Sequence, residues 1–372
     1  MAKVKNTKTG GFFGGIVLLV IGIVILWNNE GRTVQMQSAI NEAMKNYTDV
    51  ASSTVESKYE GKLIATTGNL DLSKSDPVQD SKFGIKVTGA KLERVVEMYE
   101  WVEDCTTDED NNKNCTYNKE WTTDLVDSSE FTKSGYSNPT SFKYQAAEFM
   151  ASNVKVGAFD LPKRLLESLS YNKELNNEMM TEQYKNTVEG FKVVDGYITN
   201  AENIQDAKIG DLRISYKYAS DGEVSMLGVQ SGNTLTAFTG KKGKSIFTIK
   251  RGSYTGKEIL NGMTKTNNTI KWVLRVLGVI LVIGGIGSLF APLQLLANKV
   301  PVLGGIVNFS TTLVSSVLGL AISLLVIAIA WFRFRPILSV VLLLLVIALL
   351  VFLKFQKGKS VQTLTNSKKS NW

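Results

Sequence analysis

The stretch that decides the fold is Val276–Asn298, which reads VLGVILVIGGIGSLFAPLQLLAN and holds 23 residues without a charged side chain. A helix needs about 20 apolar residues to cross the hydrocarbon core of a bilayer, so this stretch predicts a transmembrane helix at 276–298. Two more uncharged runs follow, Val300–Phe332 with 33 residues and Pro336–Leu353 with 18. The first is longer than one helix requires, and we place its crossing at 308–331. The second predicts a crossing at 336–353.

A fourth apolar run lies near the N-terminus. Residues 9–29 contain no charged side chain and follow Lys3, Lys5 and Lys8. Lysines ahead of an apolar run are also typical of a secretory signal peptide. The residues after Trp27 show no small-x-small cleavage pattern. The sequence therefore favours an uncleaved anchor that crosses the membrane at 9–29.

The charges beside these runs predict the orientation of the chain. Four crossings put residues 1–8 and the basic tail 354–372 on one side of the membrane, together with Lys299. More lysines and arginines lie on that side than on the other, where the flanking basic residues are Lys271, Arg275, Arg333 and Arg335. The positive-inside rule then makes both termini cytoplasmic. The segment 30–270 is predicted to be periplasmic, extracellular or lumenal.

Composition excludes several classes of function. The 372 residues include no histidine, which excludes Ser-His-Asp triads, Cys-His pairs and every site in which histidine binds zinc or iron. The net charge of +8 raises nucleic acid as a partner. All acidic residues, however, lie between Glu30 and residue 270, so the segment with room for a binding domain is acidic. We expect no nucleic-acid partner and no cofactor.

The two cysteines, Cys105 and Cys115, lie between residues 95–103 and 116–126, where Val, Tyr and Trp alternate with polar residues. This alternation predicts a β-hairpin. A disulfide across its mouth is sterically reasonable and fits an oxidising compartment, and two free thiols are the alternative. The residues expected to anchor its facing strands are Trp101 and Trp121.

No metal site is expected in or near this hairpin. The acidic loop 108–112 lacks the glycine and the glutamate that an EF-hand requires, so we interpret it as a solvated loop. Four carboxylates lie close together at Glu97, Glu100, Glu103 and Asp104. Side chains alternate between the two faces of a strand, and a solvated, charge-paired face is the expected arrangement. A hydrolase would instead need a buried pair of carboxyl groups.

The rest of the segment 30–270 predicts one α+β domain, mostly β. Short apolar runs bounded by Gly, Asn, Asp and Ser are typical of strands and turns. These runs are 62–67, 84–88, 91–102, 117–126, 190–197, 212–218, 224–229, 234–239 and 245–250.

Helices are predicted at Phe142–Asn153, at Leu161–Ser170 with Asp160 as its N-cap, and at Thr255–Lys265. The helical spacing of apolar residues between Met36 and Tyr47 also predicts that the first membrane helix continues outward. That apolar face packs either on its own domain or, as the alternative, on the membrane interface or another subunit.

Small and hydroxylated residues recur in the predicted spans, whose uncharged runs carry no ionisable group. The absence of such groups argues against proton relay or ion-coupled transport. The hydroxyl groups between Asn308 and Ser316 suit either a polar pore lining or helix–helix hydrogen bonds. Glycines allow close packing of helices within one subunit or between subunits. The glycines concerned are Gly10, Gly11, Gly14, Gly15, Gly284, Gly285 and Gly287.

Several short motifs occur in a fixed order between Gly10 and Phe352. They are Asn29-Glu30-Gly31-Arg32, residues 60–63, 91–92, 96–103 and 117–121, Asn138-Pro139, residues 210–213 and Arg335-Pro336. In order and spacing these motifs resemble the transmembrane protein 43 (LUMA) family of four-pass membrane proteins. The resemblance implies one span, a large lumenal domain, three further spans and a self-associating membrane scaffold. It implies no catalytic residue.

Together these features predict an α+β membrane protein with four transmembrane helices, one N-terminal and three C-terminal, and a mostly-β extracytoplasmic domain between the first and second. We expect a non-enzymatic, self-associating scaffold that organises membrane or recruits partners through that domain. Its expected partners are the bilayer, other copies of itself and other membrane proteins. The first alternative is a channel or lipid-handling protein. The second, which the sequence favours less, is an outward-facing hydrolase. The residues Asn29, Glu30, Gly31 and Arg32 are expected to fix the first helix where it leaves the membrane.

Overall fold

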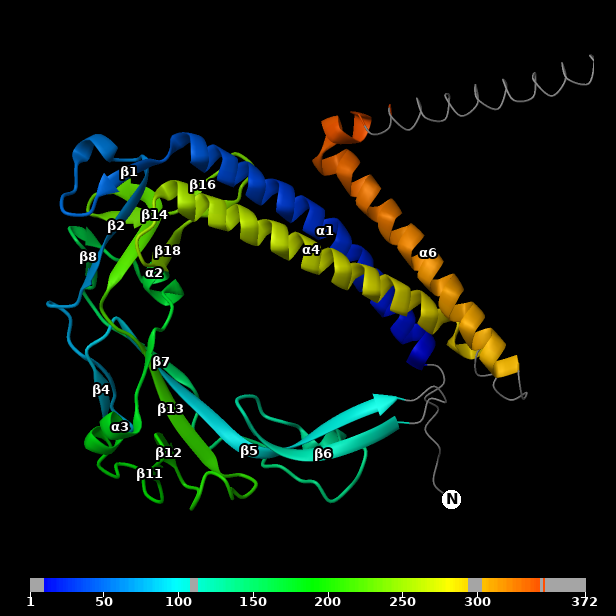
Figure 1. The fold of residues 1–372 in the computed structure, drawn as a ribbon, viewed down its shortest axis with the longest axis horizontal. Coiled ribbons are helices and arrows are strands. Elements are labelled where there is room, and N and C mark those ends of the chain that lie inside the picture. The colour runs from blue at the N-terminus through cyan, green and yellow to red at the C-terminus, as the bar shows by residue number, and fades with distance from the viewer. Residues whose placement is uncertain (1–9, 108–112, 294–302, 342–343, 345–372) are drawn as a thin grey trace, which may run out of the picture. The chain divides into compact units, whose positions relative to one another are not determined.

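The computed structural model describes residues 10–107, 113–293, 303–341 and 344 (Figure 1). The chain divides into two compact units. The helical unit comprises the chain up to residue 42, residues 239–245 and the chain from residue 260. The β-rich unit comprises residues 43–238 and 246–259. Each is described by itself below.

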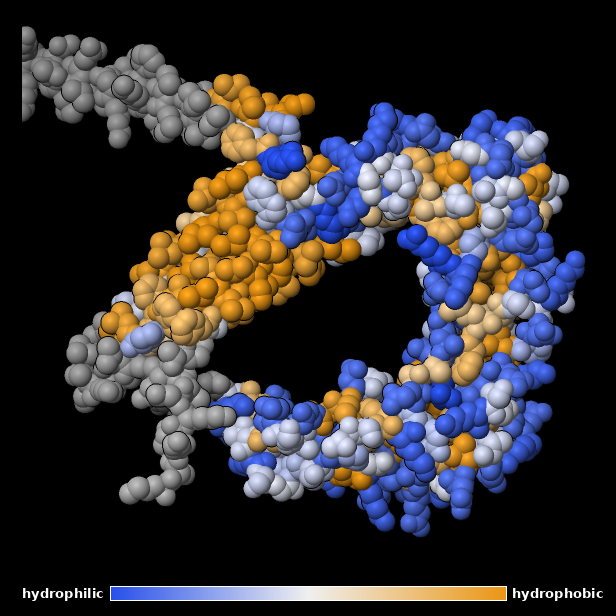
Figure 2. Space-filling model, turned by 180° about the vertical axis from the view of Figure 1, so that it is seen from behind, coloured by the Kyte–Doolittle hydropathy of each residue, from blue (hydrophilic) through white to orange (hydrophobic). Residues whose placement is uncertain are grey.

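The helical unit is built from three long helices, α1 (Gly10–Asn46), α4 (Gly256–Leu289) and α6 (Leu303–Phe334), of which α1 and α4 also extend into the other unit. Each contains a window long and apolar enough to cross a membrane. On the face seen in Figure 2, apolar side chains cover much of the length of these helices, as contact with lipid requires. The predicted fourth span, 336–353, lies mostly outside the described residues, of which 336–341 are helical.

The helices of this unit pack through a small apolar core. Leu26 of α1 and Val282 and Ile286 of α4 are buried, and side chains of α6 such as Ile322 and Val326 pack against them. The closest approach is between α1 and α4. A Cβ atom added to Gly15 would lie 2.8 Å from the carbonyl oxygen of Gly285, so only glycine fits there.

The β-rich unit contains two seven-stranded sheets among the described residues. The central strands of the first are β14 and β2, which pair antiparallel, and those of the second are β13 and β5. The first sheet comprises β1 (Thr48–Ala51), β2 (Leu63–Asp71), β8 (Lys155–Val156), β9 (Phe159–Asp160), β14 (Glu223–Ser231), β15 (Thr234–Thr236) and β18 (Thr248–Arg251). The second comprises β5 (Lys91–Thr107), β6 (Lys113–Thr122), β7 (Ala147–Met150), β10 (Lys173–Glu174), β11 (Lys192–Val194), β12 (Tyr197–Thr199) and β13 (Leu212–Ala219).

Short elements complete the chain around these sheets. The strand pairs are β3 (Val78–Asp80) with β4 (Ile85–Val87) and β16 (Phe238–Thr239) with β17 (Ser245–Ile246), and the helices are α2 (Lys163–Ser168) and α3 (Asn177–Gln183). Each large sheet has its own apolar core. Phe83, Leu92 and Tyr216 are buried in the core of the second sheet, and Phe159 and Leu165 in that of the first.

A charged group lies inside the core of the second sheet. The buried carboxylate of Asp80 lies 2.6 Å from Nη1 of Arg94 and accepts a 2.7 Å hydrogen bond from the hydroxyl of Tyr216. Burial and the neighbouring carboxylate raise the pKa of Tyr216. A buried carboxylate is tolerated only when it is paired and hydrogen-bonded, and both conditions hold here.

Several predictions of secondary structure were wrong, including the strands 234–239 and 245–250, each of which is broken into two short strands. The predicted helix 142–153 contains instead the strand β7, which pairs with β5 at the edge of the sheet. The predicted strand 190–197 is broken by a turn, since Asp195 and Gly196 have φ of 50° and 80° and connect β11 to β12 as a hairpin. An Asp-Gly pair between apolar residues is the usual signal for such a turn. In α2 the N-cap is Pro162 rather than Asp160.

Candidate functional site

The motif 29–32 lies inside α1, where the apolar run 9–29 ends. Its side chains contact α4 and α6. The carboxylate of Glu30 is fully buried. Its Oε1 accepts a 2.7 Å hydrogen bond from Nε of Arg275 and lies 2.6 Å from Nη2 of the same residue. Its Oε2 accepts a 3.0 Å hydrogen bond from Nε1 of Trp331 and lies 3.7 Å from Nη2 of Arg335. These four residues, the Glu30 cluster, join all three helices.

The neighbours of Glu30 in the motif bond to α4. The side-chain amide of Asn29 donates to the carbonyl of Lys271 over 2.9 Å. Nη1 of Arg32 donates to Oδ1 of Asn267 over 3.0 Å, and the amide of Asn267 donates to the carbonyl of Thr33 over 3.1 Å. Arg32 forms no ion pair with a described residue. The polar part of α1 is therefore held to α4 by hydrogen bonds, one of them from the charged guanidinium of Arg32 to a neutral amide, beside one buried ion pair.

Gly31 gives room to an aromatic contact between α1 and α6. A Cβ atom there would lie 2.8 Å from the ring of Phe334, which also meets Trp27 edge-on with ring centroids 5.7 Å apart. The next residues, Arg335 and Pro336, follow the end of α6. The Arg335-Pro336 turn thus directs the guanidinium of Arg335 back towards the Glu30 cluster.

The glycines of the predicted spans fall into three groups. Gly285 lies against the backbone of α1 and Gly15 against that of α4, and Gly287 lies near Ser315 of α6. Added Cβ atoms at Gly14 and Gly284 would meet nothing within 4 Å. The surroundings of the remaining two, Gly10 and Gly11, lie outside what the structure describes.

The hydroxyl groups of α6 bond to carbonyl oxygens of their own helix. Thr311 donates to Val307 over 2.8 Å, and Ser315 and Ser316 donate to Thr312 over 3.0 and 2.8 Å. Bonding within the helix therefore accounts for these three hydroxyls.

In the β-rich unit, β5 and β6 form the expected hairpin, and a disulfide joins Cys105 to Cys115 where they lie opposite each other. Glu103 lies close enough to both sulfur atoms for the three residues to bind a metal ion. Because the sulfurs are bonded to each other, no thiolate is present to bind one.

The two tryptophans of the hairpin each stack with an aromatic and a basic side chain. Trp101 meets Tyr136 edge-on at 4.8 Å, and Nζ of Lys119 lies 5.0 Å from its ring. Trp121 packs on Tyr99 at 5.1 Å, and the guanidinium of Arg213 lies 4.7 Å from its ring. Both tryptophans thus contact neighbouring strands or loops rather than lying free.

The solvated, charge-paired face expected for the carboxylates of β5 is present in part. Asp104 is exposed, and Glu97 pairs with Arg213 through two 2.7 Å hydrogen bonds, but Glu100 departs from the expectation. Glu100 is fully buried, because residues 123–126 turn back over it and the backbone N–H of Val126 reaches its Oε1. Its register partner, Glu120, is exposed, so the two do not form a buried pair of acids.

Glu103 is held by groups that favour its charged form. It accepts hydrogen bonds from the hydroxyl of Tyr117 over 2.5 Å and from the backbone N–H of Thr132 over 2.6 Å. The bond from Tyr117 is the main reason that the pKa of Glu103 lies below its ordinary range. The carboxylate is therefore a structural acceptor that ties the loop after β6 to β5.

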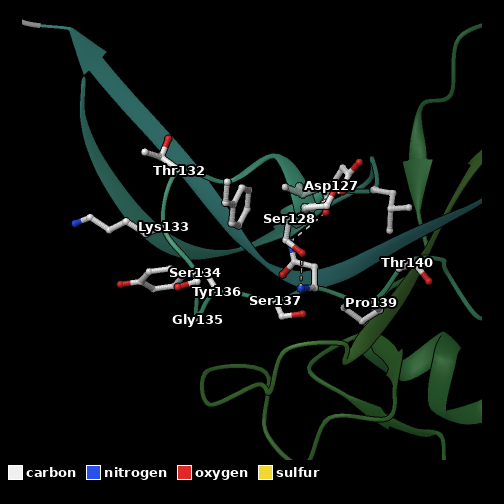
Figure 3. Close-up of a pocket in the computed structure, with 15 residues that line it drawn as sticks. Asp127, Ser128, Thr132, Lys133, Ser134, Gly135, Tyr136, Ser137, Pro139 and Thr140 are labelled. Atoms are coloured by element: carbon white, nitrogen blue, oxygen red, sulfur yellow. Dashed lines mark hydrogen bonds between the residues drawn. The ribbon is translucent and has the colours of Figure 1, made fainter. Parts of the chain in front are cut away.

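That loop, residues 125–140, lines a pocket of about 850 Å³ (Figure 3). The side chain of Asn138 ties this loop to β5. It accepts from the backbone N–H of Trp101 over 2.8 Å and donates to the carbonyls of Trp101 and Val126. Asp127 accepts two hydrogen bonds from Ser129, which lower its pKa. The charged lining groups are Asp127 and Lys133, and the loop's backbone hydrogen bonds point to a structural role.

Sequence reasoning found the motif 29–32 and Arg335 but not their partners. Arg275 and Trp331 lie 245 and 301 residues from Glu30 along the chain, and Asn267 was not singled out at all. The signal available was the single acidic residue directly after an apolar run, at Glu30. Such a residue requires a buried partner of opposite charge if its helix is packed on both sides.

Comparison with known proteins matches the sequence of this chain to one family. Residues 98–336 match the family model described as Transmembrane protein 43. Transmembrane protein 43 of Homo sapiens is 25% identical over 350 residues, covering 89% of this chain and 86% of the human protein. The Pongo abelii protein is 25% identical over 346 residues, with 88% of this chain and 85% of its own length covered.

The likeness extends to insects. The Transmembrane protein 43 homolog of Drosophila melanogaster is 27% identical over 347 residues, covering 89% of this chain and 90% of its own length. No solved structure matches. The resemblance drawn from the short motifs is confirmed, and the chain belongs to the transmembrane protein 43 family.

Proposed function

We propose that the protein is a self-associating membrane scaffold that holds its β-rich unit outside the cytoplasm and recruits partners there. The observation that carries this proposal is that the glycines of α1 and α4 are of two kinds. Gly15 and Gly285 pack against the facing helix within the subunit, whereas Gly14 and Gly284 have open space beside them. Small residues with open space on a membrane helix allow a second helix to approach closely.

The proposed orientation has both termini in the cytoplasm. The Glu30 cluster brings together Glu30, which directly follows the apolar run of α1, Arg275, which directly precedes that of α4, and Arg335, which follows the end of α6. This arrangement supports an antiparallel order in which α1 and α6 run one way and α4 the other. The lysine-rich ends of the sequence then share the opposite side, as the positive-inside rule requires of a cytoplasmic face.

The test is the mass of the full chain in a mild detergent and in nanodiscs, measured by native mass spectrometry without crosslinker. We expect a defined assembly of several copies. Gly14→Leu and Gly284→Leu should reduce the number of copies, because a larger side chain blocks close approach. Val17→Leu, at a position of α1 that is 56% exposed, is the matched control and should leave the mass unchanged.

A wild-type protein that is monomeric in both media would refute self-association. An assembly whose mass is the same in both glycine variants would refute the proposed contact while leaving self-association intact. Folding of the variants is checked separately by circular dichroism.

A further inference from the structure

A second pocket, of about 550 Å³, lies within the helical unit beside the Glu30 cluster. We call it the basic pocket. α1 contributes Thr33 and Ser38, α4 contributes Asn268 and Lys271, and the other two basic residues that line it are Lys242 and Arg335. It is therefore lined by three cations and by hydroxyl and amide groups. None of the described residues that line it is acidic.

The cations of the basic pocket are poorly neutralised by the protein. Lys242 and Lys271 form no ion pair with a described residue, and Nζ of Lys271 donates to the neutral side chain of Asn268 over 3.0 Å. The only ion pair that Arg335 forms with a described residue is the long 3.7 Å contact to Glu30, whose other carboxylate oxygen lies 2.6 Å from Arg275.

The Nε atom of Arg335 is also buried and has no hydrogen-bond partner among the described residues. A buried donor without a partner is costly, and an arginine donor is best matched by a carboxylate or phosphate oxygen. The basic pocket therefore lacks an acceptor of negative charge.

Lys242 is held in place by a short connection rather than carried on a free loop. It lies between β16 and β17, in the turn 239–245. The backbone N–H of Lys241 donates to Oε2 of Glu42 over 3.0 Å, and a Cβ atom at Gly240 would lie 2.9 Å from Ala39. This close approach to α1 presents Lys242 to the pocket before any ligand arrives, although a basic turn of this kind is usually solvated.

The basic pocket lies at the depth of lipid headgroups. It begins at Thr33, four residues after the uncharged run 9–29, and at Lys271, five residues before the run 276–298. At 1.5 Å per residue these positions are about 6–8 Å past the hydrocarbon core, within the polar layer of the bilayer. Trp331 belongs to the Glu30 cluster, Trp272 lies under the guanidinium of Arg275, and Trp27 packs on Phe334, so three tryptophans lie near this level, as is usual at a membrane interface.

We propose that the basic pocket binds a phosphate group, and that the headgroup of an anionic phospholipid in the adjacent leaflet supplies it. Lys242 and Lys271 neutralise the phosphate from two sides, Arg335 donates through its unpartnered Nε, and the hydroxyls of Thr33 and Ser38 lie within the same lining. The acyl chains of such a lipid would lie against the apolar surface of the helices, which begins next to the basic pocket at the runs 9–29 and 276–298. Self-association is not required for this site.

The experiment uses the full chain, delipidated in detergent and then analysed by native mass spectrometry with added phosphatidylglycerol or phosphatidylcholine. We expect one tightly held phosphatidylglycerol per subunit and no comparable retention of phosphatidylcholine. In Lys242→Gln/Lys271→Gln the affinity for phosphatidylglycerol should fall about thirtyfold, which is about 2 kcal/mol at 1.4 kcal/mol per factor of ten. Lys241→Gln/Lys244→Gln removes the same total charge, both from the turn that carries Lys242, at positions that do not line the pocket, and should keep wild-type affinity.

A parallel arm distinguishes the two sources of phosphate. Inorganic phosphate is added to the delipidated protein, and the melting temperature is measured. A phosphate-dependent rise that the Lys242→Gln/Lys271→Gln variant loses, without a lipid adduct, would assign the site to a free anion. Equal retention of both lipids by the wild-type protein together with no phosphate effect overturns the proposal, and this comparison needs no variant. Equal loss of affinity in the control double variant would overturn it as well.

Discussion

Replacing Glu30 by glutamine should destabilise the helical unit more than any other single change at its polar end. The variant keeps the size of the side chain but removes the charge that faces Arg275 at 2.6 Å. The guanidinium of Arg275 would then lie over the rings of Trp272 and Trp331, with the cation Arg335 in the same cluster and no counter-charge at the fully buried position 30. Removing one partner of a buried ion pair typically costs about 3–5 kcal/mol, and we expect a loss in that range.

The distances within the cluster predict a graded series. Arg275→Gln should cost nearly as much as Glu30→Gln, because it leaves the carboxylate buried without its closest partner. Arg335→Gln should cost less than about 1 kcal/mol, since its 3.7 Å contact resembles a weak surface pair. The double variant Glu30→Gln/Arg275→Gln should cost less than the sum of the two single variants, because it removes both charges of the pair and so leaves neither of them unpaired.

The assay is unfolding of the purified chain in mixed detergent micelles, followed by tryptophan fluorescence, to which Trp331 contributes directly because its indole donates to Glu30 over 3.0 Å. The reasoning fails if Glu30→Gln costs less than about 1 kcal/mol, or if Arg335→Gln costs as much as Arg275→Gln. It fails equally if the double variant shows simple additivity.

Three further predictions concern other parts of the chain. Gly285→Ala should lower the melting temperature of the helical unit, at a cost of about 1–3 kcal/mol from its contact with the α1 backbone, whereas Gly284→Ala, with open space, should be neutral or slightly stabilising. Cys105→Ser should cost about 2–3 kcal/mol in a reductant-free denaturation curve, and wild-type protein should take up a thiol reagent only after reduction. Tyr117→Phe should make the free energy of unfolding fall less steeply as the pH is lowered, because it removes the hydrogen bond that lowers the pKa of Glu103. In the wild-type protein that lowered pKa stabilises the fold above about pH 4.3, and the contribution is lost as the pH falls. The melting temperatures of the wild-type protein and the variant, plotted against pH, should therefore converge at low pH.

The elements that the sequence predicts well are those whose signal is local. Three apolar runs predicted the three long helices, since crossing a membrane depends on the length and polarity of one segment. The strand pattern around Cys105 predicted the β5–β6 hairpin, because alternation and a turn lie within thirty residues. The helical spacing after residue 29 predicted the outward continuation of α1, which ends at Asn46.

Features that depend on distant pairing were missed. The helix predicted at 142–153 has apolar residues at helical spacing, yet hydrogen bonds to the edge of β5 make it a strand. Glu100 was expected to be solvated, and it is buried because a loop more than twenty residues later folds over it. In the same way, Arg275 and the turn that carries Lys242 lie far from Glu30 along the sequence, so the residues around Glu30 do not indicate that these groups lie near it. Propensity describes a segment, whereas burial depends on what the rest of the chain places beside it.

The long separation between Glu30 and its partners has a consequence for synthesis. Arg275 follows Glu30 by 245 residues. At about 5–20 residues per second, a ribosome needs roughly 12–50 seconds to make that interval. Throughout it, the first span stays in the membrane with a carboxylate whose counter-charge does not yet exist. A nascent chain that stops before α4 therefore carries an acid directly after its first apolar run, without the arginine that pairs with it in the complete fold.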